Sequence, residues 1–312
     1  MVKIAILGAS TPLAGEIIRI LINHPETELI SLIAPTLTGR SVSSVHHGLI
    51  GETQLNFTDR LDLNELDLLL VMDGSQQSKE ILSMAVNNDN LKVVVAIPDS
   101  EHQIDENGYE FGLSEINRKA LVRGATKAII PSPVVVPALI ALVPLAKFLL
   151  LNSDILIDVT LPEDIAAPLK MSKEENFIAQ QLQKFQNSFN CKVILHTHGD
   201  KISERAMYSK ITLKTALSQE EIEKIFEQAY EDHNFTFLSR NEIVPEEVEG
   251  TQKTIIHLNK IDSDTLEIDI VNDARMRGGA GDIVHVMNLF FGLHEKTGLH
   301  FKSSSFFKKQ HS

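Results

Sequence analysis

The first part of the chain alternates between short apolar runs and segments whose apolar residues recur every three or four positions. The periodic segments predict helices, one beginning at Thr11 and Pro12 and one covering 77–86. Thr11 suits the N-cap of the first helix and Pro12 its first position. The apolar runs predict buried strands, which we expect at 2–7, 29–33, 68–72, 92–97 and 127–130.

The pattern changes near residue 133. Long strands with alternating apolar and polar positions then follow helical segments, which is typical of an α+β layout with a mainly antiparallel sheet. Ser218 and Glu221 form a capping-box pattern at the start of one helix. We expect helices at 136–151, 172–188, 218–233 and 281–296, and strands at 155–161, 192–198, 206–215, 253–261 and 266–271.

Together these patterns predict an α/β protein with two domains. Strands that alternate with helices indicate a doubly wound (Rossmann-type) parallel sheet, which we assign to residues 1–132 and 278–312. The α+β domain, residues 133–277, is inserted into it, and the last helix returns to the first domain.

Composition narrows the classes of partner. The chain has a formal charge of −13, which argues against nucleic acid because phosphate binding needs a basic face. The apolar run 134–151 contains Pro137, Pro144 and Lys147 and is therefore expected to be a buried helix, not a membrane span. The chain opens on a strand and not on a signal peptide, and its single cysteine, Cys191, excludes an intrachain disulfide. We expect a cytoplasmic protein whose partner is a small-molecule metabolite or nucleotide.

The loop after the first strand is the first candidate site. It runs from Gly8 to Gly15, where a dinucleotide-binding loop would open a helix. Two interpretations stay open: a structural turn, or a weakened cofactor loop, because Pro12 lacks an N–H donor. No acidic residue follows the second strand, and Arg40 is available for a 2′-phosphate, so NADP is favoured over NAD. The candidate cofactor-binding residues here are Gly8, Ser10, Thr11, Pro12, Leu13 and Arg40.

A pair of histidines is the second candidate. His196 and His198 lie two apart on a predicted strand and so face the same way, with Asp200 beyond them. This pattern admits a metal site, to which His46 and His47 are conceivable additions, or an acid/base role. The plainer interpretation, which we favour, is a polar strand face at an interface; no metal is expected.

A set of segments near the two ends of the chain carries a resemblance to known proteins: Gly8-Ala9-Ser10, 16–21, His24-Pro25, 45–51, 109–118, 277–281 and 287–293. These segments are similar to N-acetyl-gamma-glutamyl-phosphate reductases, and the chain thus resembles the family that includes aspartate-semialdehyde dehydrogenases. The resemblance implies that Gly279, Gly281 and Asn288 lie in the family's cofactor-side loop and helix, and that the protein forms a homodimer or homotetramer through its second-domain sheet.

The same resemblance implies a cysteine thiolate at the start of a long apolar helix, which forms a thioester before hydride transfer with NADP. In this chain Pro133 takes the cysteine position, and a second alignment places Ser132 there, with no base evident for it. The family's acid/base histidine would fall within 174–182, which has no histidine, and the segment 94–100 lacks the family's arginine. Cys191 is expected to be a small structural residue.

These departures predict an NADP-dependent semialdehyde dehydrogenase scaffold that is catalytically degenerate. Ser132, His196 and His198 are weak catalytic candidates. Two alternatives remain: an active oxidoreductase on an acyl phosphate or semialdehyde with a rearranged site, and a non-catalytic protein that binds a metabolite or a paralogue.

Overall fold

The computed structural model describes residues 1–88, 90–97, 108–200 and 203–303, and the chain divides into two compact units. The first contains Met1–Pro131 and Gly279–His300, and the second contains Ser132–Gly278 and residues 301–303. Residues 301–303 group with the second unit, where Ser303 Oγ donates to the Glu246 carbonyl at 2.9 Å.

The first unit is built on a parallel sheet of six strands in the order β2-β1-β3-β4-β6-β5. This order, with crossovers through helices, is the doubly wound sheet that the alternating pattern predicted. The sequence prediction missed β5, which is two residues long. The strands are β1 (Val2–Leu7), β2 (Thr27–Ile33), β3 (Leu68–Val71), β4 (Lys92–Val95), β5 (Glu110–Phe111) and β6 (Lys127–Ile129).

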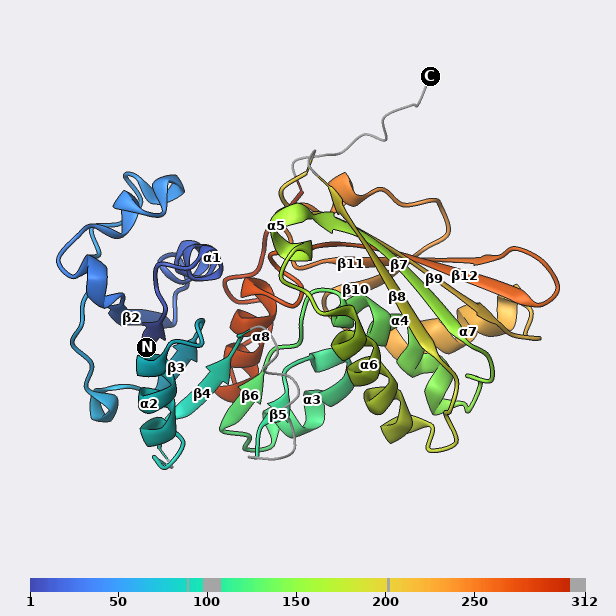
Figure 1. Cartoon of the computed structure of the whole chain (residues 1–312), viewed down its shortest axis with the longest axis horizontal. Helices are drawn as coiled ribbons and strands as arrows, with labels where there is room; N and C mark the ends of the chain where they lie inside the picture. The colour runs from blue at the N-terminus through green and yellow to red at the C-terminus, as the bar shows by residue number, and fades with distance from the viewer. Residues whose placement is uncertain (89, 98–107, 201–202, 304–312) are drawn as a thin grey trace, which may run out of the picture. The chain divides into compact units, whose positions relative to one another are not determined.

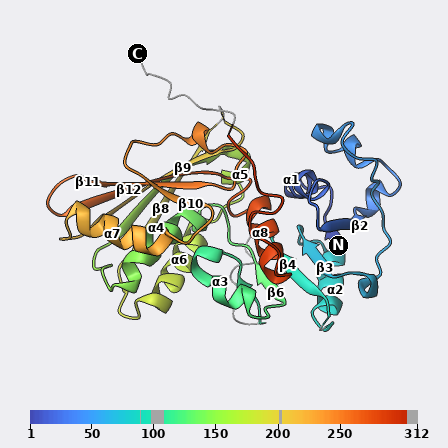
Figure 2. The same cartoon turned by 180° about the vertical axis from the view of Figure 1, so that it is seen from behind.

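The described residues of this unit contain four α-helices: α1 (Pro12–Leu21), α2 (Gln76–Ala85), α3 (Ser114–Val122) and α8 (Ala280–Phe290). All residues of α8 are buried, because it packs against α1, α3 and β4 (Figures 1 and 2). It ends six residues before the predicted 296, since Gly292 takes a left-handed φ of +64° there. Short 3-10 helices cover Pro35–Leu37, Val42–Ser44, His47–Leu49 and Leu63–Glu65.

A buried histidine ties α1 to α8. His24 Nε2 lies 3.1 Å from Asn288 Oδ1, and its Nδ1 accepts the Glu26 N–H at 3.3 Å. Both ring nitrogens are therefore used by the neutral imidazole. Burial lowers the pKa of His24 below its usual value, and a proton on Nδ1 would also face the N–H of Glu26.

The second unit is built on a mixed sheet in the order β10-β11-β12-β9-β7-β8. The β10–β11 and β7–β8 pairs are parallel and the other three are antiparallel, in line with the expected mainly antiparallel sheet. Helices α4, α6 and α7 lie together over one face of it (Figures 1 and 2). The strands are β7 (Ile155–Pro162), β8 (Val193–Asp200), β9 (Ala206–Lys214), β10 (Thr236–Ser239), β11 (Thr254–Lys260) and β12 (Thr265–Asp273); the helices are α4 (Val135–Lys147), α5 (Glu163–Ala166), α6 (Met171–Phe185) and α7 (Gln219–Tyr230), with a 3-10 helix at Pro245–Glu247.

The long apolar helix α4 is the core of this unit, as predicted, and its residues 135–146 are all buried. Pro144 lies inside it and has no N–H to offer the carbonyl of Ile140. The hydroxyl of Tyr230, on α7, donates to that carbonyl at 2.5 Å instead. The helix ends at Lys147, short of the predicted 151, where Leu149 adopts a left-handed φ of 59°. None of the helices within the described residues is long and apolar enough to cross a membrane.

The neutral state of His24 makes stability depend on pH. An unfolded histidine takes up a proton near pH 6.5, whereas the folded His24 resists protonation. The unfolded chain therefore binds more protons as the pH falls, and the free energy of unfolding should decrease below about pH 6.5, by at most about 1.4 kcal/mol per pH unit for this one group. Urea denaturation between pH 7.5 and 5 measures this slope.

The variant His24→Gln keeps an N–H for Asn288 but cannot titrate, so its slope should be shallower than that of the wild type. His300→Gln, at an exposed position, is the control and should leave the slope unchanged. Equal slopes for wild type and His24→Gln would contradict the assignment of a buried, neutral His24.

Candidate functional site

The glycine loop of the first unit lies at the switch point of the parallel sheet. Gly8 follows β1 with a φ of +73°, and a Cβ added to it would lie 2.8 Å from Cγ of Asp73, which follows β3. Because β1 and β3 are neighbours with crossovers on opposite sides, this is where doubly wound folds bind ligands. Gly8 is thus required by its conformation and by the close approach of Asp73.

Some backbone N–H groups at the start of α1 are already hydrogen-bonded within the loop. Thr11 Oγ1 accepts the Ala14 N–H at 3.3 Å, as the capping pattern predicted, and the Thr11 N–H donates to the Gly8 carbonyl at 3.0 Å. Pro12 has no N–H to give.

Two backbone donors remain for a ligand. Within the part of the chain that the structure describes, nothing accepts a hydrogen bond from the N–H of Ser10 or of Leu13. Both belong to the positive end of α1, which favours an anion. The loop therefore fits a phosphate group, with fewer donors than a loop without Thr11 and Pro12 would have.

The segment after β2 folds over this loop. His46 Nε2 lies 2.8 Å from the Ala9 carbonyl, and a Cβ on Gly15 would lie 2.6 Å from His46 Nδ1. Gly15 is therefore explained by packing against this ring, and the His46 side chain contributes to packing within the first unit. Arg40, on the same segment, is exposed, so its guanidinium is accessible.

The C-terminal candidates lie on α8. Gly279 is its N-cap residue and Gly281 is buried in its first turn. Asn288 is fully buried; its Nδ2 donates to the carbonyls of Glu295 at 3.2 Å and Thr297 at 2.9 Å, and its Oδ1 faces His24. Holding α8 against the end of α1 is enough to explain Asn288 without a cofactor contact.

In the second unit, the start of α4 carries a side-chain pair that the sequence did not reveal. Ser132 Oγ donates to Glu174 Oε2 at 2.8 Å. Glu174 is only 2% exposed, because it heads the buried stripe of α6 that faces α4, a stripe formed by Glu174, Phe177, Ile178, Gln181 and Leu182. Ser132, for which the sequence showed no evident base, therefore has a buried carboxylate as its hydrogen-bond acceptor. The two segments that the resemblance assigned to the nucleophile and the acid/base group do lie together.

Pro133 is covered by the backbone of the glycine-rich loop. Gly278 has a φ of +68°, and a Cβ added to it would lie 2.6 Å from both N and Cα of Pro133. The buried carboxylate of Asp273 organises this loop: it accepts from Arg205 Nε at 2.7 Å, from the Gly250 N–H at 2.6 Å and from the Arg275 N–H at 2.9 Å.

The two arginines before the glycines, Arg275 and Arg277, are held within the second unit and are not a solvated pair. Arg277 is fully buried. Arg275 donates from Nη2 to Asp164 at 3.0 Å and from Nε to the Glu204 carbonyl at 2.8 Å. Both side chains are thus part of the interior or the edge of the second unit.

His196 and His198 face the same way on β8, as their spacing predicted. Nδ1 of His196 and Nε2 of His198 lie 3.1 and 3.9 Å from the same oxygen of Asp158, on β7. The alternate residues Leu195 and Thr197 contact α6, through Glu175 and Met171 respectively. The histidines therefore project from the opposite face of the sheet and do not join Ser132 and Glu174. The described residues contain no group of three or more His, Cys, Asp and Glu placed to hold a metal ion.

Cys191 lies beyond the C-terminal end of α6, whereas Glu174 lies in the first turn of that helix. About 16 Å of helix separates Glu174 from that end. Cys191 therefore does not approach the start of α4, and it is not a replacement nucleophile there.

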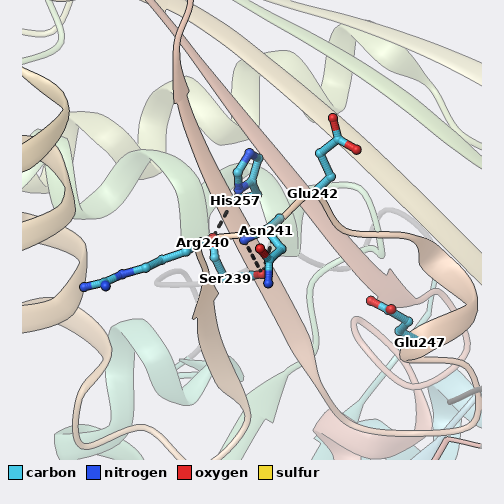
Figure 3. Close-up of a pocket in the computed structure, with 6 residues that line it drawn as sticks. All are labelled: Ser239, Arg240, Asn241, Glu242, Glu247 and His257. Carbon is cyan, nitrogen blue, oxygen red and sulfur yellow. Dashed lines mark hydrogen bonds between the residues drawn. The ribbon is translucent and has the colours of Figure 1, made fainter. Parts of the chain in front are cut away.

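A polar pocket of about 610 Å³ opens beside β10 and β11. His257 donates from Nδ1 to the Ser239 carbonyl at 3.1 Å. Figure 3 shows the Arg240 side chain directed away from Glu242 and Glu247. His257 alternates with buried positions of β11 and so lies on the sheet face opposite the helices. The pocket is thus separate from the pair at the start of α4. Its lining is Ser239, Arg240, Asn241, Glu242, Glu247 and His257.

Comparison with known proteins identifies the class. Residues 3–123 match the model of the semialdehyde dehydrogenase NAD binding domain. The structure is similar to aspartate semialdehyde dehydrogenase II of Vibrio cholerae complexed with ASA (TM-score 0.70, 14% identity, 94% of this chain and 98% of that chain). It is also similar to the Candida albicans aspartate semialdehyde dehydrogenase with NADP (TM-score 0.71, 13% identity, 93% and 99%). The fold and its first domain are therefore those of semialdehyde dehydrogenases.

Full-length sequence similarity gives the particular family. The chain is 31% identical to the N-acetyl-gamma-glutamyl-phosphate reductase of Parabacteroides distasonis over 98% of its own length and 100% of that protein. It belongs to the N-acetyl-gamma-glutamyl-phosphate reductase family, as the resemblance of its motifs indicated.

The contact between Gly278 and Pro133 can be tested by substitution. Gly278→Ala introduces both a left-handed alanine and a clash with Pro133, and should lower the free energy of unfolding by about 3 kcal/mol. Gly250→Ala is the matched control, because Gly250 has a φ of +73° with nothing within 4 Å of an added Cβ. It should cost only the conformational part, about 1–2 kcal/mol. Urea denaturation of both variants measures the difference, and equal losses would contradict the close packing at Pro133.

Proposed function

We propose that this chain is a nucleotide-binding member of its family that has lost the thioester-dependent reductase reaction. The observation that carries the proposal is Pro133, which occupies the position expected for the nucleophilic cysteine at the start of α4. Proline has neither a thiol nor an N–H. The helix start is otherwise intact, since the Ser132 carbonyl accepts the Val135 N–H at 3.1 Å.

The chemistry explains why the neighbouring serine does not restore the reaction. A thioester is a good hydride acceptor because sulfur donates little electron density to its carbonyl carbon. An oxygen ester on Ser132 would be much less electrophilic. The proposal therefore separates the binding half of the family's activity, which this chain keeps, from the reductive half, which it lacks.

NADP is the nucleotide we propose, and its nicotinamide supplies a hydride when bound. The backbone N–H groups of Ser10 and Leu13 would hold a phosphate at the start of α1, and the exposed Arg40 would hold the 2′-phosphate. The carboxylate of Asp73 beside Gly8 places negative charge near that phosphate, which weakens binding.

The proposal also covers the ligand of the second unit, the oligomeric state and the cellular compartment. The ligand of the second unit would be a small acyl metabolite, the class that the relatives' names indicate. We also propose a cytoplasmic homodimer or homotetramer that pairs through the open face of the mixed sheet. Ile194, 37% exposed, and Phe237, 43% exposed, support an interface there. The alternatives are a rearranged but active oxidoreductase and a non-catalytic binder of a paralogue.

The first test is turnover. The purified protein is incubated with NADP⁺, phosphate and either N-acetylglutamate semialdehyde or aspartate semialdehyde, and absorbance of NADPH is followed. We expect a rate at least about 10⁴-fold below that of the Parabacteroides distasonis relative, because the nucleophile is absent. Pro133→Cys should not restore the rate, since no histidine occupies 174–182. Phosphate-dependent turnover by the wild type would sink the proposal and favour the rearranged oxidoreductase.

The second test is cofactor binding. Calorimetric titration with NADPH should give measurable affinity, and Arg40→Gln should weaken it about tenfold, because one charge-assisted contact to the 2′-phosphate is lost. NADH affinity should not change in that variant. Arg123→Gln, at an exposed site after α3, is the control with the same change of charge. An equal effect of both variants, or none, would remove Arg40 from the proposed cofactor site.

A further inference from the structure

We infer that Ser132 and Glu174 form a nucleophile–base pair that transfers activated acyl groups to water, an esterase or acyl-phosphate hydrolase activity. The inference deepens the proposed function, because it assigns a remaining chemistry to the site where the reductase reaction is lost. It concerns side chains of the second unit alone and needs no nucleotide.

The geometry of the pair meets the first requirement of a base-activated serine. The hydroxyl of Ser132 donates directly to Glu174 Oε2, and the 2.8 Å separation is within the range for proton transfer between a nucleophile and its base. The serine is partly exposed, whereas the glutamate is 2% exposed. The base is thus shielded from water and the nucleophile can still be reached by a substrate.

Two helix N-termini lie near Ser132 Oγ and the Glu174 carboxylate, and their positive ends favour negative charge at these atoms. Glu174 lies in the first turn of α6 and Ser132 just precedes α4, so the positive ends of two helices lie at the pair. Pro133 contributes no N–H, and the next donor along the chain is Val134. Its N–H, at the start of α4, has no acceptor among residues 1–88, 90–97, 108–200 and 203–303. Because Val134 is itself fully buried, this N–H does not reach a bound acyl group, and the site supplies the nucleophile and its base.

A second serine–glutamate pair in the same unit shows what a purely structural pair looks like. Ser203 Oγ donates to Glu249 Oε1 at 2.7 Å, but it also accepts the N–H groups of Arg205 at 3.1 Å and Ala206 at 2.8 Å. The lone pairs that would attack a carbonyl carbon are therefore committed to a turn. Ser132 Oγ accepts no such backbone N–H among the described residues.

The reaction balances without an oxidant or reductant. Ser132 Oγ attacks the acyl carbon while Glu174 takes the hydroxyl proton. The bond from carbon to the leaving phosphate or alcohol breaks, and the leaving oxygen departs with the electron pair and takes the proton from Glu174. Water then attacks the seryl ester, Glu174 takes a proton from the water, and the Ser132 oxygen leaves and recovers that proton. The products are a carboxylic acid and phosphate or alcohol.

The experiment uses the full chain without nucleotide, with p-nitrophenyl acetate and acetyl phosphate as probes. Wild-type protein should hydrolyse at least one of them above the buffer rate. Ser132→Ala and Glu174→Gln should each reduce the rate at least about 100-fold, the usual contribution of a nucleophile or a general base. Ser203→Ala, purified in the same way, is the matched control and should keep the wild-type rate.

Two further measurements separate chemistry from folding. Thermal denaturation reports whether each variant is folded, and Glu174→Gln keeps an acceptor for the Ser132 hydroxyl. Mass spectrometry of acid-quenched protein should locate the acetyl group on the peptide that contains Ser132. The inference is overturned if the wild type hydrolyses neither probe, if folded Ser132→Ala retains the rate, or if the label is found elsewhere.

Failure here is distinguishable from failure of the proposed function. The hydrolysis assay contains no NADP, and the reductase and NADPH titration assays do not depend on Ser132. Loss of the hydrolytic reaction would leave those results standing, whereas NADP-dependent turnover would remove the proposed function whatever the hydrolysis rate.

Discussion

The hydrogen bonds accepted by the buried carboxylate of Asp273 are the constraint on which the second unit's site depends. Four N–H donors converge on this one side chain: Nε of Arg205 and the backbone N–H groups of Gly250, Arg275 and Met276. They fix the loop that ends at Gly278, and this loop in turn covers Pro133. The loop packs against the start of α4 on one side, and Glu174 binds the Ser132 hydroxyl on the other. The position of Ser132 is therefore fixed by buried contacts and not by its own residue type.

Most of the framework could be predicted from the sequence, because strands and amphipathic helices leave a local periodic signal. This periodic pattern does not show at which residue an apolar helix ends. The α4 helix ends at Lys147, just before a left-handed Leu149, and a leucine gives no signal for this conformation. The α8 helix ends just before Gly292, a residue type that commonly follows the end of a helix. The two residues of β5 are too few to show a period, and they owe their pairing to β6.

The site was predictable only in part, and for a physical reason. The loop at Gly8, the changed residue at Pro133 and the shared face of His196 and His198 are local features of the chain. The partner of Ser132 is 42 residues away, and nothing in a single sequence reports such contacts. One indirect signal existed: Glu174 is a charged residue at the head of an otherwise core-facing stripe of α6, and a buried carboxylate requires a partner.

The proline inside α4 has a consequence for how such a site can change. Pro144 has no N–H for the Ile140 carbonyl, and this carbonyl accepts the Tyr230 hydroxyl instead. This hydrogen bond fixes the position of α4 relative to α7, about two helical turns away from Ser132. If the helix slid or rotated, the Ile140 carbonyl would lose its hydrogen bond while remaining buried in the core. Substitutions at the tip of α4 are thereby uncoupled from its placement, and chemistry at residues 132 and 133 is free to diverge while the architecture stays in register.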